Sequence, residues 1–279
     1  MDEPLQRFEA DAMSPLAPGP LIRLSHGTLK VEVAPQAGGR IASIVRKDVE
    51  QLVGYGQSNT AMIGWGCYPM LPWAGRIRNG RFKFEARNFQ LPMNLGAHAI
   101  HGFGLAMPWQ LESRDARSLE LSLALPQDAR WPFGGTACQR IELSDDQVEL
   151  HLSIKAGALA MPAVIGWHPW FRKPERLQFY PEAIYPRDAA GIATLPLAPP
   201  PAGPWDDCFT NTKTVTLECG GYQLHLSSDC THWVVYDQVD AAVCIEPQSG
   251  PPDAFNIEPF VLAPGATLHR RFCMVWNDR

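Results

Sequence analysis

The sequence lacks the signatures of several large classes of protein. Its basic residues form no run, and 24 Lys and Arg against 29 Asp and Glu give a net charge of −5, so neither nucleic acid nor an anionic membrane surface is expected as a partner. No apolar stretch approaches the ~20 residues of a membrane-spanning helix, and the opening residues MDEPLQRFEADAM contain no apolar segment of a signal peptide. These absences predict a soluble, cytoplasmic protein.

Cysteine is present, but its number and spacing suggest neither a disulfide framework nor a metal-binding motif. The seven cysteines are odd in number and include no C-x-x-C pair, which favours buried free thiols over a disulfide scaffold or a zinc ribbon. His98 and His101 have a spacing that metals tolerate, but no neighbouring ligand completes a site, so no metal is expected. The motifs G-x-S-x-G and G-x-x-x-x-G-K are also missing, which argues against a serine nucleophile elbow and a phosphate loop. No cofactor is predicted.

A helical pattern of three turns is missing as well, whereas strand-like alternation recurs along the chain. Alternating runs occur at 29–33, 138–143 and 148–154, residues 268–275 form the last predicted strand, and glycine and proline separate about a dozen such segments. Since 46% of the residues are hydrophobic, a large core can form. We predict an all-β fold, one large antiparallel β-sandwich, made by a single domain of residues 1–279.

Two proline-rich stretches interrupt this pattern. Residues 1–20 contain several prolines and are predicted to be a loosely attached N-terminal arm. Residues 173–204 contain too many prolines for a core element, and they are predicted to cross the surface as a long connection with short edge strands. That connection is a candidate domain boundary, but candidate site residues lie on both sides of it, which favours a single domain.

The stretch 68–104 combines the residue types of a binding pocket. It places Arg76 and Arg78 close to Trp73 and ends on His98 and His101, among glycine and proline breakers that favour loops. An indole face can stack on a pyranose, while guanidinium, amide and carboxylate groups bind its hydroxyls. The combination suggests a sugar-binding pocket, although tryptophan can equally belong to a sandwich core.

Two later segments carry a candidate acid and a candidate base. His168 lies between two tryptophans, one of them Trp167, where a partly dry pocket would shift its pKa; the alternative is a hydrogen-bonded imidazole in an aromatic cluster. Glu246 ends an apolar run, which places it at a pocket rim or at an exposed strand end. Asp206 and Asp207 are adjacent, and because successive strand residues face opposite sides, at most one is expected to face a ligand.

Five ordered segments resemble the aldose 1-epimerase (galactose mutarotase) family. They are PWAGRI with Arg76, HAIHG with His101, WHPWF with His168, WDDCF with Asp206, and EPQ with Glu246 followed by PDAFN. One such motif is weak evidence, whereas five in the same order are fairly specific. The resemblance covers the chain from Gly38 to the last predicted strand.

The resemblance implies a fold, a reaction and roles for individual residues. The fold would be the galactose mutarotase-like supersandwich, and the reaction would interconvert the α and β anomers of a free aldohexose such as galactose or glucose. Glu246 would be the general base, His168 the general acid and His101 a second histidine at the ring oxygen. The remaining expected binding residues are Arg76, Asp206, Gln248, Trp73 and Trp167. A small sugar would be the partner of a monomer or homodimer.

The sequence departs from the family pattern in two places. Gly75 stands where the better known sugar mutarotases have asparagine before the arginine, and Gly166-Trp167 replaces Thr-Asn ahead of the second histidine. These departures concern sugar specificity most.

Three alternatives stay open at this point. Arg40, Arg76 and Arg78 could bind the phosphate of a hexose 6-phosphate. A sugar-binding protein on the same fold could lack catalysis. A glycoside hydrolase would need a second carboxylate beside Glu246, and none stands out.

Overall fold

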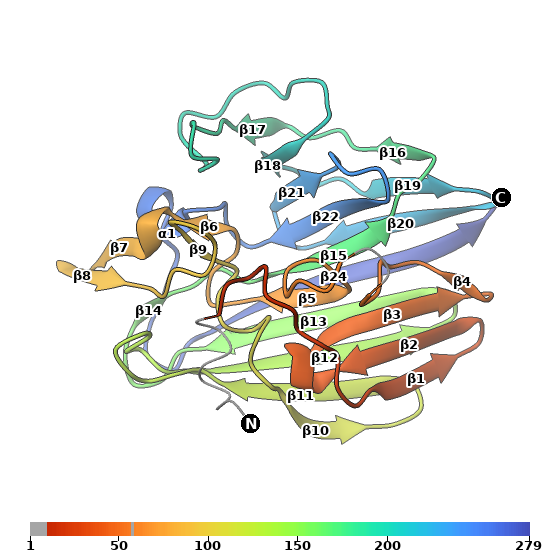
Figure 1. Cartoon of the computed structure of the whole chain (residues 1–279), viewed down its shortest axis with the longest axis horizontal. Coiled ribbons are helices and arrows are strands. Elements are labelled where there is room, and N and C mark those ends of the chain that lie inside the picture. Colours follow the sequence, from red (N-terminus) through yellow and green to blue (C-terminus); the bar gives the residue numbers. More distant parts are fainter. Residues whose placement is uncertain (1–9, 57–58) are drawn as a thin grey trace.

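Two large antiparallel β-sheets pack face to face in the computed structural model, which describes residues 10–56 and 59–279 (Figure 1). The first sheet has ten strands and the second has eight. In spatial order, the first sheet contains β1 (Ile22–His26), β2 (Leu29–Ala34), β3 (Arg40–Arg46), β5 (Cys67–Met70), β15 (Gly166–Arg172), β22 (Ala242–Gln248), β21 (His232–Tyr236), β18 (Asp206–Thr210) and β17 (Ala183–Tyr185), with β4 (Val49–Glu50) beside β3. The second sheet contains β10 (Gln110–Arg114), β11 (Ser118–Ala124), β12 (Thr136–Ser144), β13 (Gln147–Lys155), β24 (Thr267–Asp278), β20 (Tyr222–Ser228), β19 (Val215–Cys219) and β16 (Arg176–Gln178).

Alternation along the strands explains why the two sheets pack together. Buried side chains alternate with more exposed ones along β12 and β13, so each strand presents one apolar face. On the first sheet, the ring centroids of Trp167 and Trp233 lie 5.8 and 6.2 Å from that of Phe272 on β24. These contacts join the inner faces of the sheets. The predicted all-β sandwich is confirmed.

The proline-rich segment 173–204 passes from one sheet to the other. Its short strands β16 and β17 pair at the edges of the second and first sheets, as the proline content predicts. One continuous apolar core includes residues before and after this segment, such as Leu150, Phe209 and Met274. This shared core supports a single domain.

The N-terminal segment is attached to the body more firmly than the sequence suggests. The N–H of Ala12 donates to the carbonyl of Asn94 at 2.6 Å, and Ala12 is fully buried. In return, the N–H groups of Met62 and Ile63 donate to the carbonyls of Ser14 and Ala12 at 2.8 and 3.2 Å. Backbone hydrogen bonds therefore attach residues 12–16 to the body, despite the prolines that predicted a loosely attached arm. Residues 1–9 lie outside the described residues.

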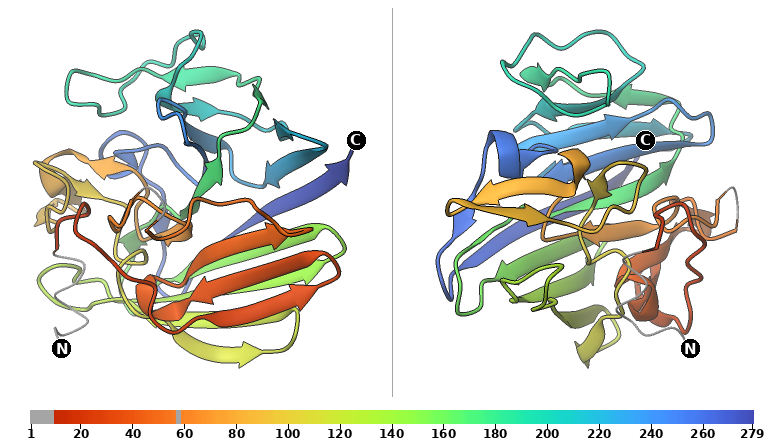
Figure 2. Two further views of the ribbon diagram at one scale, coloured as in Figure 1. Left: turned by 45° about the vertical axis from the view of Figure 1, so that its right-hand side comes forward. Right: turned by 60° about the vertical axis from the view of Figure 1, so that its left-hand side comes forward.

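Short elements form a third group at one end of the sandwich (Figures 1 and 2). They are β6 (Arg76–Ile77) with β9 (Ala99–Ile100), β7 (Arg81–Phe84) with β8 (Arg87–Gln90), β14 (Met161–Pro162) with β23 (Val261–Leu262), the 3₁₀ turn at Arg78–Gly80, and the helix α1 (Ala254–Ile257). A second 3₁₀ turn, at Pro35–Ala37, connects β2 and β3. Neither α1 nor another helix in residues 10–56 and 59–279 has the length and apolar character needed to span a membrane.

Candidate active site

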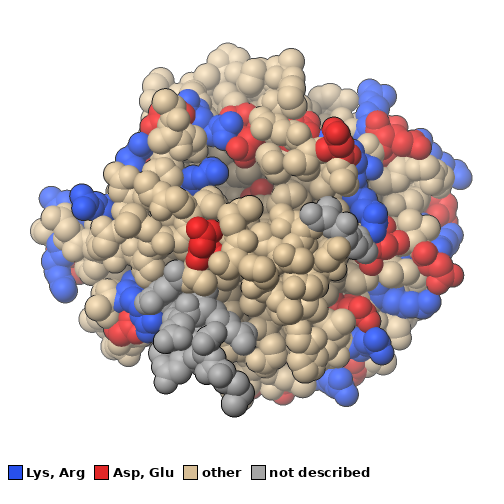
Figure 3. Space-filling model, in the orientation of Figure 1, with Lys and Arg blue, Asp and Glu red and all other residues tan. Residues whose placement is uncertain are grey.

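A cavity of about 650 Å³ opens on the face of the first sheet that points away from the second. Side chains of β15, β22, β21 and β18 line it, together with residues of the N-terminal segment, the β6 segment and the proline-rich connection. Figure 3 shows a hollow in the face seen in Figure 1, with acidic and basic side chains at its upper edge. Strands of the first sheet thus form one wall of the cavity, and loops around its opening form the other walls.

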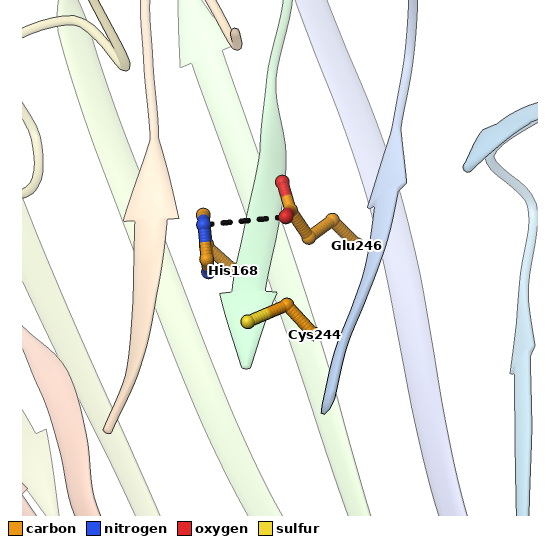
Figure 4. Close-up of side chains that lie close together, drawn as sticks. All are labelled: His168, Cys244 and Glu246. Atoms are coloured by element: carbon orange, nitrogen blue, oxygen red, sulfur yellow. Dashed lines mark ion pairs between the residues drawn. The ribbon is translucent and has the colours of Figure 1, made fainter. Parts of the chain in front are cut away.

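His168 and Glu246 face each other in this cavity. They lie on the hydrogen-bonded antiparallel neighbours β15 and β22, and Nε2 of His168 is 3.2 Å from Oε1 of Glu246 (Figure 4). Both side chains line the cavity, although only 9% and 3% of their surfaces are exposed. The sheet therefore brings together the acid and the base expected from the sequence, 78 positions apart along the chain.

Burial shifts the protonation of this pair towards neutral groups. Desolvation lowers the pKa of His168 to about 3, with the nearby Arg40 cation acting in the same direction and a backbone hydrogen bond opposing it. Desolvation, and then the charge of Asp206, raise the pKa of Glu246 well above its usual value, while Gln248 and Arg76 act in the opposite direction. Between these two pKa values the pair holds a single proton. One proton is what an acid–base pair needs to have one donor and one acceptor.

His101 is the third titratable group at this position. Its Nδ1 accepts a hydrogen bond from the backbone N–H of Gly75 at 3.2 Å, so in the neutral ring Nε2 carries the proton. Burial, and then the proximity of His168 and Arg76, keep the pKa of His101 well below its ordinary value. The ring centroids of His101 and His168 are 5.1 Å apart, at 89° to each other. His101 is therefore a neutral hydrogen-bond donor beside the acid–base pair.

A buried cation supports the orientation of His168. Tyr68 stacks on the imidazole of His168, with centroids 4.7 Å apart. The guanidinium of Arg40 lies over the rings of Tyr68 and Trp65, 4.9 Å from the centroid of Tyr68 and 4.3 Å from that of Trp65. Arg40 also donates to the carbonyls of Ala37, Met62, Trp65 and Leu105. Arg40 thus has a structural role behind Tyr68 and does not line the cavity.

Arg76 and Gln248 lie in the cavity as the sequence predicts. The amide of Gln248 donates to Oε2 of Glu246 at 3.2 Å, whereas His168 contacts the other oxygen, Oε1. Its Oε1 is buried without a hydrogen-bond partner among the described residues. Because an unpaired buried acceptor is costly, this oxygen is suited to a ligand hydroxyl.

Asp206 and Asp207 both line the cavity, which corrects the expectation that at most one would do so. Arg187 explains the difference: its Nη1 lies 2.5 Å from Oδ2 of Asp206, and its Nε lies 3.0 Å from Oδ1 of Asp207. One guanidinium therefore draws both carboxylates to the cavity side. Arg187 was not predicted from the sequence, because nothing in the proline-rich connection marks it.

The two expected tryptophans lie outside the cavity. Trp73 and Trp167 are 1% and 0% exposed and belong to the apolar core, so their rings cannot stack on a ligand there. Trp170 and Tyr236 line the cavity instead, with ring centroids 6.0 Å apart. Strand alternation explains the correction, because His168 and Trp170 are two residues apart and share a face of β15, whereas Trp167 faces the other sheet.

A cysteine lies beside the acid–base pair. The side chains of His168, Cys244 and Glu246 converge, with one potential ligand atom from each within 4.8 Å of the others (Figure 4). Cys244 was not singled out from the sequence, although Cys244 and Glu246 are two residues apart and therefore share a face of β22.

Comparison with known proteins identifies the family. The family model described as aldose 1-epimerase matches residues 20–272. The chain belongs to the aldose 1-epimerase family. Within curated proteins, the uncharacterized protein YphB of Escherichia coli K12 is 33% identical over 151 residues, which span 53% of this chain and 50% of YphB. The alignment thus spans about half the length of that relative.

Solved structures show the same fold as this aldose 1-epimerase family member. A galactose mutarotase-like protein from Clostridium acetobutylicum superposes with a TM-score of 0.83 at 16% identity, covering 93% of this chain and 95% of that one. A galactose 1-epimerase from Lactobacillus acidophilus superposes with a TM-score of 0.78 at 18% identity, covering 92% and 94%. At these identities the likeness concerns the fold alone.

Both departures of this aldose 1-epimerase family member have local structural reasons. Gly75 has φ +66°, and a Cβ there would lie 2.6 Å from Cβ of Pro252. The close approach of these two segments therefore requires glycine before Arg76. Trp167 fills the space between the two sheets, as its contact with Phe272 shows. Neither departure removes the side chain of His168 or Glu246 from the cavity.

Proposed function

We propose that this protein is an aldose 1-epimerase that interconverts the α and β anomers of a free aldohexose such as galactose or glucose. The observation that carries the proposal is the contact between His168 and Glu246 at 3.2 Å, almost fully buried at the floor of an open cavity. The C1 hydroxyl and the ring oxygen are bonded to the same carbon, and the reaction needs a proton acceptor at the hydroxyl and a proton donor at the ring oxygen. A pair that holds a single proton supplies both.

The reaction proceeds by ring opening and closure. Glu246 removes the proton of the C1 hydroxyl while His168 gives a proton to the ring oxygen, so the bond between C1 and the ring oxygen breaks and an aldehyde forms. Rotation about C1–C2 presents the other face of the aldehyde, and the same steps in reverse close the ring. Both groups return to their initial state, and each positioned proton transfer contributes roughly 10²–10⁴-fold to the rate.

The pair must reach the state with an ionised carboxylate and a protonated imidazole. A proton shift along the contact between Glu246 and His168 is sufficient, because both forms of the pair have no net charge. The positive charge of Arg76 favours this shift, since it lowers the pKa of Glu246 against the effect of burial. A neutral His101 with its proton on Nε2 then donates a hydrogen bond to the ring oxygen or a neighbouring hydroxyl.

The proposed binding roles follow from the positions around the pair. Arg76, Asp206 and Gln248 offer donors and acceptors to the sugar hydroxyls from three sides of the cavity. Trp170 supplies the apolar surface for the C–H face of the ring, in the role first expected of Trp73 and Trp167. A hexose needs on the order of 200 Å³, if each of its C–O units takes about the ~30 Å³ of a water molecule in the liquid.

The three arginines suggested for a phosphate do not converge. Arg40 is fully buried and donates to backbone carbonyls. Arg78 pairs with Asp188 at 2.7 Å and lies outside the residues that line the cavity, which leaves Arg76 alone of the three. This arrangement favours a sugar without a phosphate group.

Polarimetry tests the proposed function directly. Freshly dissolved α-D-galactose, α-D-glucose and glucose 6-phosphate are each followed with and without catalytic amounts of protein. We expect the optical rotation of the free sugars to approach equilibrium faster with protein, and the phosphate ester to respond less. Sugar binding by calorimetry without any acceleration would instead indicate a non-catalytic sugar-binding protein.

A further inference from the structure

The proposed reaction makes no use of Cys244, although its thiol lies at the acid–base pair. Cys244 and Glu246 point to the same side of β22, and His168 approaches from β15 (Figure 4). One ligand atom from each residue lies within 4.8 Å of the other two, and all three residues are buried. A thiol, an imidazole and a carboxylate are the three ligand types that zinc prefers.

The spacing of the imidazole and the carboxylate suits a tetrahedral metal. Two ligand atoms at ~2.0–2.1 Å from a tetrahedral zinc ion lie roughly 3.3 Å apart. His168 Nε2 and Glu246 Oε1 are 3.2 Å apart, so a metal can bridge them with little movement. His168 and Glu246 also line the open cavity, which provides a path for the ion and leaves a fourth position for water or a sugar hydroxyl.

The charges of the ligands fit a buried divalent cation. A thiolate and a carboxylate together neutralise an M²⁺ ion, so the occupied site carries no net charge and its burial is tolerated. The unpartnered Oε1 of Gln248, a side chain with no exposed surface, adds a buried acceptor beside the cluster, suited to a metal-bound water.

A second cluster on the outer face of the second sheet provides a contrast. Glu142, Glu149 and His151 also lie within ligand distance of one another. However, Arg140 pairs with Glu142 at 2.5 Å and Arg271 pairs with Glu149 at 3.4 Å, so both carboxylates there already have cationic partners. These ion pairs disfavour a metal at the outer cluster.

We propose that His168, Cys244 and Glu246 form an inhibitory site for a thiophilic divalent cation such as Zn²⁺. Binding releases two protons, one from the thiol and the one shared by the acid–base pair, and forms one bond each to sulfur, nitrogen and oxygen. The metal then occupies Nε2 of His168 and the carboxylate of Glu246, so neither can transfer a proton. The inhibition depends on the proposed mutarotase activity, whereas metal binding itself does not.

Co²⁺ and Zn²⁺ titrations test the two parts separately. The metal-free protein is titrated with CoCl₂, and the charge-transfer absorption of a Co²⁺–thiolate bond is recorded. Mutarotation of α-D-galactose is then measured against ZnCl₂, followed by EDTA. We expect one stoichiometric thiolate band, loss of activity with zinc, and recovery with the chelator.

Cys244→Ser and Cys67→Ser form a matched pair of variants. Cys67 is also a buried thiol of the first sheet, but it belongs neither to the cluster nor to the residues that line the cavity. Because even an outer-shell partner is worth ~10–100-fold in metal affinity, Cys244→Ser is expected to lose the band and to need ~100-fold more zinc for half inhibition. Cys67→Ser should behave as the unmodified protein. An unchanged Co²⁺–thiolate band in Cys244→Ser would overturn the proposal, whether or not the protein proves to be a mutarotase.

Discussion

Replacing Glu246 with glutamine removes the proposed proton acceptor and changes little else in the cavity. Glu246 contacts His168 and Gln248, each at 3.2 Å, and a glutamine amide has the shape and hydrogen-bonding groups to keep both contacts. The substitution also removes an ionisable group that is only 2% exposed, so no loss of stability is expected. Any large loss of activity must then come from chemistry.

The size of that loss follows from the role of the residue. A positioned general base contributes roughly 10²–10⁴-fold, which corresponds to about 2.7–5.4 kcal/mol at ~1.36 kcal/mol per decade. Arg76, Asp206 and His101 remain in place, so sugar affinity should change little. The loss is therefore expected in kcat, with KM nearly constant.

Polarimetry of fresh α-D-galactose measures the rate, and calorimetry measures sugar binding. Glu149→Gln is the matched control, because Glu149 is a partly buried glutamate on the second sheet, far from the cavity-lining residues. It should retain the full rate. If Glu246→Gln equilibrates the anomers as fast as the unmodified protein, the acceptor lies elsewhere and the proposed mechanism is wrong.

Three further predictions concern pH, substrate stacking and stability. In metal-free buffer, kcat/KM should stay level as the pH falls through 4.5, the ordinary pKa of a glutamate. The reason is that the pair of His168 and Glu246 already holds its first proton there, and His168 takes up a second proton only near pH 3. A fall in kcat/KM centred at pH 4.5 would contradict the shared-proton state. Trp170→Ala should raise KM several-fold and lower the urea midpoint only slightly, through loss of its hydrogen bond to the Ile63 carbonyl. Trp167→Ala should instead lower the midpoint strongly, since truncating a fully buried tryptophan to alanine costs about 3–5 kcal/mol; the opposite pattern would place Trp167 at the sugar. Arg40→Met should lower the free energy of unfolding by ~3 kcal/mol or more, because four buried carbonyls lose a charged donor. An unchanged urea midpoint would contradict this prediction and would mean that water replaces the guanidinium.

The sandwich could be predicted because its strands carry their own signal. The run 148–154 alternates strictly and the run 138–143 nearly so, and they form the paired strands β13 and β12. Pairing between distant strands carries no such signal. Nothing local in the sequence places β5 next to β15 or β24 next to β13, because these contacts result from closing the whole core.

The site could be predicted only where side-chain type and strand position agreed. His168 and Glu246 were candidates because an imidazole and a carboxylate interrupt apolar runs, and the family resemblance then implied their roles. Trp167 was misplaced, although strand alternation alone assigns it to the face opposite His168. Arg187 could not have been found, since its role depends on Asp206 and Asp207, which reach it only after the connection folds back onto β18.

The acid–base pair lies on the sheet, whereas other cavity-lining residues lie outside it, and this separation affects which substitutions can alter substrate choice. The proton-transfer pair is held by neighbouring strands, and their register cannot slip without turning every side chain to the wrong face. Met13, Arg76 and Arg187, in contrast, reach the cavity from segments outside that ladder. Substitutions or insertions in those segments can therefore alter which sugar is accepted while the reaction itself is preserved.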